Sequence, residues 1–378
     1  MSPAFSGLGP TVGTYAERVA LASPQIGQLF YQTNTDEIVK FGTDVDGIQR
    51  WMMADHDYSR NLVVNGGFDV WQRTTTSTVS TADYYGPADR WQTTRLSSDT
   101  GRTFSRQPIT SSDTPVLGFT YFMRCQRDAS NAALNSILMT TSFETTSVRR
   151  TQNKYVTLSF YARAGANYSA ASGFLRAYVT TGTGTDGRLL VSNFTSPTVL
   201  VDSNNTLTTS WKRFTVTTSA PVGSAITQMG VSFQFTPVGT AGAADYYDVT
   251  GVQLEAASAP SEFEFEPFET TLRKCQRYFQ RYVDPPLIGV VDGTTRPTRM
   301  SMVLPVVMRA DPTAAFAGTL NFFDGQTASG AFSSVQSSWL KTTSVQFDFN
   351  LTVGFPTIGR AVILYVNGGG TMSLSAEL

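Results

Sequence analysis

Residues 155–164 read YVTLSFYARA, and this stretch decides the fold class. Val156, Leu158 and Phe160 occupy alternate positions, with other residues between them. A period of two is typical of a β-strand that has one face in a core and the other toward solvent. The segment therefore predicts a strand of a sheet that packs on one face.

Strand-like runs of the same kind occur on both sides of this segment. Clusters of Gly, Pro, Ser and Asn separate them, and these residues favour turns. Such spacing, with few helical patterns, predicts that residues 61–268 form one β-sandwich domain. The runs are NLVVNGGFDVW, TYFMRC, SILMTTSFET, FLRAYVTT, SWKRFTVTT, QMGVSFQF and DYYDVTGVQLE.

The first 60 residues contain few apolar side chains. Within them GQLFYQTNTDEIVKF, residues 27–41, predicts a hairpin of two short strands, with TNTD as the turn. A single hairpin is only marginally stable in water. We therefore expect residues 1–60 to be an attachment and linker segment that is ordered by a partner chain or a larger assembly.

One stretch has the spacing of a helix, ETTLRKCQRYFQRYV at residues 269–283. Thr270 or Thr271 is expected to cap its start, and Pro285-Pro286 to end it. The sequence thus predicts a connecting helix over residues 269–284. The apolar positions on one face are Leu272, Cys275, Phe279 and Tyr282.

Residues 285–378 are expected to form a second and smaller β-domain. Its strand candidates are SMVLPVV, TLNFF, SVQFDFNL, AVILYV and TMSLSAEL.

Composition narrows the class of protein. Charged residues make up 15% of the chain, against ~25% in a typical soluble protein. The net charge is −1 and the longest basic run is Arg149-Arg150, so a nucleic-acid partner is not expected. No run of 18 apolar residues predicts membrane insertion, and the start of the chain lacks the pattern of a secretory signal. These features favour a virion component made in the host cytoplasm.

The residues needed for common catalytic chemistry are scarce. The chain has one histidine, His56, and two cysteines, Cys125 and Cys275, which we expect to be buried thiols. Phosphate-binding and metal-binding motifs are absent from the sequence. Glu264 and Glu266 share one face of an extended segment, and a solvated face is the favoured interpretation over a glycosidase pair. We therefore expect no enzymatic activity.

An ordered series of motifs points to a family. NLVVNGGFDVWQR is followed by ADRWQ, WKRFTVTT, VTGVQLEAASAPSEFEFEPF and LRKCQRYFQRY, and the chain ends in Ala376-Glu377-Leu378. Over residues 61–378 this series resembles the carbohydrate-binding-module-like region of bacteriophage tail fibre and tailspike-type virion proteins. The QLFYQTNTD stretch is similar to a hairpin near the start of phage fibre proteins.

The resemblance implies a jelly-roll sandwich, a position on the virion, assembly as a homotrimer and a part in host recognition. The N-terminal segment would bind other tail or adaptor proteins of the particle. No cofactor is certain. Structural calcium is implied where the first and last strands meet, with Asp69 and Asp248 as ligands.

Aromatic residues are candidates for a glycan site, because rings stack on the flat apolar faces of sugars. Tyr84 and Tyr85, in TADYYGPADRW, precede a Gly-Pro turn that would hold them outward, and the alternative is that one or both cover the end of the sandwich. Trp71 and Trp91 are expected in the core, with a sugar platform as the alternative. A structural ion pair is expected from the Asp89-Arg90 pair.

The sequence thus predicts a non-enzymatic tail fibre protein that contributes to adsorption on a host-surface glycan. The alternative is a purely structural virion component, such as a head fibre or a tail or collar adaptor.

Overall fold

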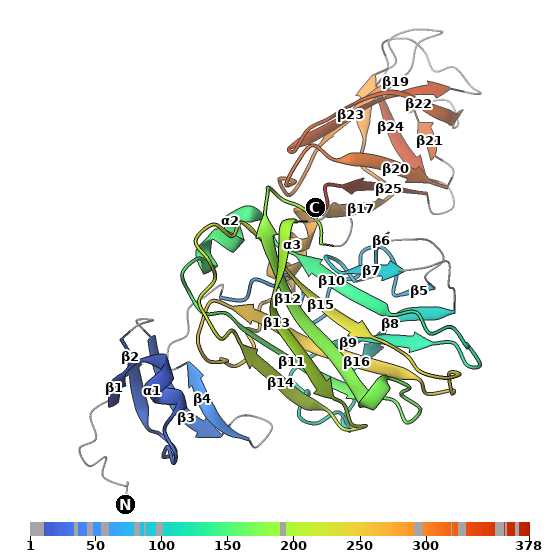
Figure 1. Ribbon diagram of the computed structural model, residues 1–378. Helices are drawn as coiled ribbons and strands as arrows, with labels where there is room; N and C mark the ends of the chain where they lie inside the picture. Colours follow the sequence, from blue (N-terminus) through green and yellow to red (C-terminus); the bar gives the residue numbers. More distant parts are fainter. Residues whose placement is uncertain are drawn as a thin grey trace, which may run out of the picture. The chain divides into compact units, whose positions relative to one another are not determined.

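The computed structural model consists mainly of β-strands (Figure 1). The chain divides into two compact units. The first is Met1–Phe268 together with Leu378, and the second is Glu269–Glu377. Each unit is described by itself. The structure describes residues 11–33, 37–43, 48–53, 60–78, 84–86, 88–95, 101–189, 194–290, 298–318, 320–323, 330–351, 359, 361–366 and 370–378. His56 lies outside these residues, as does the side chain of Tyr84.

The N-terminal segment contains a four-stranded sheet in the order β1-β2-β3-β4, with a short helix α1, Tyr15–Val19. The expected hairpin is confirmed, because β2 and β3 pair antiparallel with Tyr31 opposite Ile38. Phe30 and Val39 pack with Ala259 in a small core, so the segment holds more structure than one hairpin. The strands are β1 Thr11–Gly13, β2 Leu29–Gln32, β3 Glu37–Thr43 and β4 Gln49–Met53.

Residues 61–268 form a jelly-roll β-sandwich of two six-stranded antiparallel sheets. We call the sheet ordered β13-β12-β15-β10-β7-β6 the β12 sheet, and the sheet ordered β14-β11-β16-β9-β8-β5 the β16 sheet. The strands are β5 Thr76–Thr78, β6 Tyr84–Tyr85, β7 Gln92–Arg95, β8 Arg102–Pro108, β9 Tyr121–Arg127, β10 Ile137–Ser142, β11 Thr157–Ala164, β12 Phe174–Thr183, β13 Thr195–Thr206, β14 Lys212–Thr217, β15 Gln228–Phe235 and β16 Tyr246–Glu255. Short helical turns are α2 Thr145–Val148, η1 Arg149–Thr151 and η2 Ala171–Gly173.

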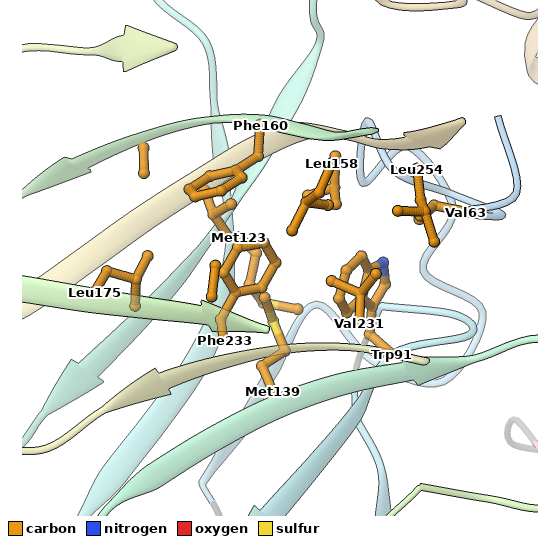
Figure 2. Close-up of a cluster of buried hydrophobic side chains, with 14 of the residues drawn as sticks. Val63, Trp91, Met123, Met139, Leu158, Phe160, Leu175, Val231, Phe233 and Leu254 are labelled. Carbon is orange, nitrogen blue, oxygen red and sulfur yellow. The ribbon is translucent and has the colours of Figure 1, made fainter. Parts of the chain in front are cut away.

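Alternating apolar residues of the two sheets meet in one core. Val156, Leu158 and Phe160 are all buried there, as their spacing predicts. Figure 2 shows Phe160 close to Phe233 of the opposite sheet, and their ring centroids lie 4.8 Å apart. Trp91 is also part of this core, which confirms the structural interpretation of that residue.

Residues 61–71 form turns and extended chain where a strand was predicted. Asn65 and Phe68 have φ of 62° and 57°, which a strand does not allow, so the chain turns at these residues. A Cβ on Gly66 would lie 2.0 Å from the carbonyl oxygen of Val252, and the Val252 amide donates to the Gly66 carbonyl at 3.0 Å. The turn therefore lies directly on strand β16.

The second unit contains a closed barrel in the order β18-β19-β23-β22-β21-β24 and a three-stranded sheet β17-β25-β20. The predicted strands of this region are all present. Their bounds are β17 Phe279–Val283, β18 Ile288–Val290, β19 Thr298–Val303, β20 Thr313–Ala317, β21 Leu320–Phe323, β22 Gly330–Leu340, β23 Ser344–Leu351, β24 Ala361–Val366 and β25 Thr371–Ser375.

The predicted helix over residues 269–284 is too long. Helix α3 spans Phe268–Gln276, and strand β17 follows it and pairs antiparallel with β25. Aromatic residues are favoured in strands as well as tolerated in helices, and pairing with β25 places residues 279–283 in a strand. Thr270 and Thr271 consequently lie inside the helix, and Pro285-Pro286 follows a strand. Cys275 is buried as predicted.

Replacement of Gly66 tests the contact between the turn and β16. We expect Gly66→Ala to destabilise the sandwich by ~1–3 kcal/mol, because the new methyl group overlaps the Val252 carbonyl. Gly223→Ala is the matched control, since its nearest contact would be 3.7 Å away. Calorimetry of the full chain measures both, and equal melting temperatures for the two variants would refute the contact.

Candidate functional site

A row of polar and aromatic residues crosses the β12 sheet from edge to edge. Consecutive members lie directly opposite each other in the strand register. Their sequence neighbours, such as Val179, Phe233, Met139 and Trp91, enter the core, so the row lies on the outer face. Five strand spacings give it a length of about 24 Å. We call it the polar row, and its members are Asp202, Tyr178, Ser232, Thr140, Gln92 and Tyr85.

The middle of the polar row holds polar groups without partners. Ser232, Thr140 and Gln92 are at most 2% exposed. Among the described residues, Thr140 Oγ1 and Gln92 Nε2 are buried and make no hydrogen bond. Leaving such a group unsatisfied costs about 1–3 kcal/mol, so each has a strong tendency to bind a hydroxyl group or an ordered water.

Tyr85 forms one end of the row. It is half-buried in strand β6 and does not lie in an outward loop as predicted. Guanidinium carbons of Arg73, Arg90 and Arg188 lie 5.6, 5.8 and 5.9 Å from its ring centroid. Tyr84 shares the strand, but its side chain is outside the described residues, so its proposed role stays a prediction.

Tyr178 stands near the other end. The guanidinium of Arg176 lies 4.8 Å from its ring and donates to both carboxylate oxygens of Asp202 at 2.6 and 2.5 Å. The Tyr178 hydroxyl donates to Gln234. Burial raises the pKa of Tyr178 to about 12, against the opposing effect of Arg176, so the hydroxyl stays protonated at neutral pH.

One side of the row is bordered by the segment after β12. The Leu189 amide donates to Ser142 Oγ at 2.9 Å, and Leu189 itself is buried. A Cβ on Gly230 would lie 3.0 Å from a Leu189 methyl group, so the segment lies close to the sheet. This border limits access to the centre of the row.

The expected calcium ligands have other partners. Asp248 is fully buried, and its carboxylate accepts hydrogen bonds from Arg124 at 2.8 and 3.0 Å and from Arg163 at 2.8 Å. Calcium requires several oxygen ligands that are not already neutralised. The guanidinium groups of Arg124 and Arg163 already neutralise the Asp248 carboxylate, so we do not assign this residue as a ligand of a cation.

Asp69 gives no further support for calcium. Burial raises the pKa of its carboxyl group, and a hydrogen bond with Thr120 opposes the shift. Within the described ranges, no group of three or more His, Cys, Asp or Glu side chains is placed to hold a metal. Because Arg124 and Arg163 already bind the Asp248 carboxylate, the Asp69–Asp248 pair does not fit a calcium site.

The remaining sequence candidates have structural roles. Trp71 is partly buried and donates to the Phe68 carbonyl at 2.5 Å. Asp89 forms an ion pair with Arg73 at 3.0 Å, whereas Arg90 donates to the Ser142 carbonyl. The expected Asp89–Arg90 ion pair is therefore wrong, because Arg73 is the partner of Asp89 and Arg90 is bound to a backbone carbonyl.

Both cysteines are free and buried, and burial raises the pKa of Cys125 to about 12, which removes its nucleophilic form at neutral pH. The Glu264 carboxylate accepts from the Asn61 amide at 2.8 Å, so this carboxylate fastens two segments together. No helix among the described residues is long and apolar enough to span a membrane.

Comparisons with solved structures find several matches at low similarity. A tailspike protein 4 enzymatically active domain of bacteriophage CBA120 shares 10% identity at a TM-score of 0.30, over 52% of this chain and only 21% of that one. A Stig cyclase of Fischerella shares 14% identity at a TM-score of 0.33, over 53% of this chain and 98% of that one. The CBM22-1 xylan-binding domain of Paenibacillus barcinonensis Xyn10C shares 13% identity at a TM-score of 0.28, over 49% of this chain and 94% of that one.

Similarity at this level carries no argument about function. No protein-family model matches the chain. A search of curated protein sequences also finds no match.

Acid should destabilise the sandwich through Asp113. Burial opposes its ionisation, but hydrogen bonds from Thr110 and Trp211 and the charge of Arg163 lower its pKa to about 2. An unfolded Asp titrates near 3.9, so the stabilisation is full above about pH 4 and is lost as pH falls toward 2. We expect a loss of about 2–3 kcal/mol.

Denaturation across this pH range, with Asp113→Asn beside the parent chain, measures the effect. The variant should be less stable at pH 7 and should show a flatter acid limb. Asp311→Asn, which removes an exposed carboxylate, is the control. An unchanged acid limb in Asp113→Asn would contradict the assignment.

Chelation tests the arginine assignment of Asp248. Because Arg124 and Arg163 neutralise this carboxylate, EDTA should leave the melting temperature of the sandwich unchanged. A clear decrease that calcium restores would show that a cation site exists after all.

Proposed function

We propose that this chain is a non-enzymatic fibre protein of a bacteriophage virion, and that its jelly-roll contributes to recognition of a host-surface glycan. The ordered motifs of residues 61–378 support the phage assignment. The observation that carries the glycan role is the polar row, which places unsatisfied hydrogen-bonding groups between two tyrosines.

The chemistry of the row suits a saccharide. Sugar rings have apolar faces that stack on aromatic rings, and their hydroxyls pair with amide and hydroxyl side chains. Tyr85 and Tyr178 supply rings, while Gln92 and Thr140 supply a donor and a hydroxyl whose hydrogen bonds are unmet in the chain. Tyr178 remains neutral, which suits a neutral hydroxyl partner.

Several copies would compensate for weak binding at each site. A single shallow site is expected to bind with a Kd on the order of 1 mM. Assembly as a homotrimer, which we also propose, and several fibres per particle would raise avidity by ~10² to 10⁴. Val12, Val19 and Ile26 are exposed in the N-terminal segment and offer apolar surface to a tail or adaptor protein.

A purely structural role, as a head fibre or a tail or collar adaptor, is the second candidate. The burial of Thr140 and Gln92 favours it, because a glycan reaches these groups only if the residues that cover them move. Under this alternative, ordered waters would satisfy the two groups.

The double variant Thr140→Val with Gln92→Leu separates the two candidates. Removing buried polar groups that lack partners is nearly neutral or stabilising for the fold, so the melting temperature should hold or rise. Binding of the full-length chain to host cells should fall about tenfold, since two hydrogen bonds of ~0.5–1.5 kcal/mol each are lost.

Thr103→Val provides the matched control, because Thr103 lies beside core residue Phe104 on the other sheet and faces outward. Unchanged adsorption by the folded double variant would refute glycan binding through the polar row and would favour the purely structural role.

A further inference from the structure

The outer face of the C-terminal barrel carries a second cross-strand row. Its members lie opposite each other in the register of six neighbouring strands. Residues next to them in sequence, including Met300, Phe347 and Val362, fill the barrel. The members of this row are therefore directed away from the barrel interior. In strand order the row is Phe323, Ile363, Ile288, Ser301, Gln346 and Trp339.

An open groove follows one part of this row. Its volume is about 610 Å³, and strands β18, β19, β23 and β22 form its floor. Trp339 and Ile288 line it at the two ends of four consecutive row positions, with Gln346 and Ser301 between them. The groove lies wholly within the second unit and shares no residue with the polar row of the sandwich.

Trp339 is the most informative residue of the groove. Its side chain is 52% exposed, although burying a tryptophan is strongly favourable. An exposed indole in a groove is typical of a surface that stacks on a ligand. Gln346 lies one strand spacing away, about 4.8 Å, and Ser301 two spacings away, so both can hydrogen-bond a ligand that covers the ring.

The charges around the groove are balanced within the chain. Lys341, which lines it, forms an ion pair with Asp311 at 2.8 Å. Arg299, whose guanidinium lies 5.9 Å from the Trp339 ring, pairs with Asp348 at 3.2 Å. These two cations are thus already neutralised, which favours a neutral ligand over an acidic one.

We propose that this groove is a binding site for a neutral pyranose saccharide. The apolar face of one sugar ring stacks on Trp339, and its hydroxyls hydrogen-bond with Gln346 and Ser301. The site is independent of the polar row and of the phage assignment. As a shallow, open site it should bind weakly, with a Kd on the order of 1 mM.

A second copy of the chain is the competing occupant. Phe323, Ile363 and Ile288 form an exposed apolar run in the same row, which would suit a protein interface. Within the groove, however, two polar residues separate Trp339 from Ile288. The buried core of a protein interface is more apolar than the rest of the surface, whereas a sugar site requires polar groups beside the ring.

Fluorine NMR of the full-length chain labelled with 5-fluorotryptophan tests the proposal. The sequence contains five tryptophans, and Trp339→Phe identifies the signal of Trp339 by its loss. Maltohexaose and cellohexaose serve as neutral probes, and polygalacturonate as the acidic one. We expect a saturable shift of the Trp339 signal with at least one neutral probe, and a weaker response to polygalacturonate.

Variants locate the binding further. Gln346→Ala should weaken binding of the neutral probe by about two- to tenfold, because one ligand hydrogen bond is lost. Phe323→Ala, in the same row but outside the groove, should leave the titration unchanged. Thr140→Val with Gln92→Leu should also leave it unchanged, so failure of the sandwich site and failure of this site are distinguishable.

Two results would overturn the proposal. One is the absence of a saturable Trp339 shift with both neutral probes. The other is a shift that follows protein concentration, together with a drop in mass by light scattering in Trp339→Ala, which would make the groove an interface between copies.

Discussion

The sandwich depends on how its first residues bind its last strand. The Leu62 amide donates to the Leu254 carbonyl at 2.9 Å, and the side chain of Asn61 accepts from the Leu254 amide at 3.1 Å and donates to the Val252 carbonyl at 3.2 Å. Gly66 completes the contact, since any larger residue would overlap the backbone of β16. The turn that follows sets Phe68 against Trp91, with ring centroids 5.1 Å apart. Motifs almost 200 residues apart are thereby joined at one place.

Charged residues are few, and many of them work inside the fold. Arg127 and Asp245 are both fully buried and pair at 2.8 Å, and Arg127 also donates to the carbonyls of Asn131 and Ala133. A buried ion pair is tolerated when its remaining donors are satisfied in this way. The Arg124–Asp248–Arg163 group follows the same rule on the outer face of the β16 sheet. The guanidinium groups of Arg124 and Arg163 therefore neutralise Asp248, the carboxylate that the sequence assigns to a calcium ion.

The sequence was sufficient for most strands and insufficient for the sites. Alternation identifies β11 because apolar residues occupy the face that enters the core, although its other face is buried as well. β13 is one of the strands that the pattern misses, since TSPTVLVDSNNT contains a proline and several exposed polar residues at the edge of its sheet. The helix was predicted too long because FQRYV fits helical spacing, and only its pairing with β25 makes it a strand. Tyr85 was noticed as an aromatic residue, whereas Thr140, Gln92 and Trp339 gave no signal. Their positions depend on strand register, which brings distant segments together and is not encoded in local spacing.

The two cross-strand rows show how a sheet creates a surface without any local motif. In each, alternate residues fill a core, and the register aligns the remaining ones across six strands. In the sandwich the centre of the row is buried, so any ligand must displace the residues that cover it and repay that cost. The described strands of the barrel close on themselves, so none of these strands leaves a free edge in the wall to pair with another chain. Recognition by the barrel wall must therefore use side chains, and Trp339 is the largest of those that this row exposes.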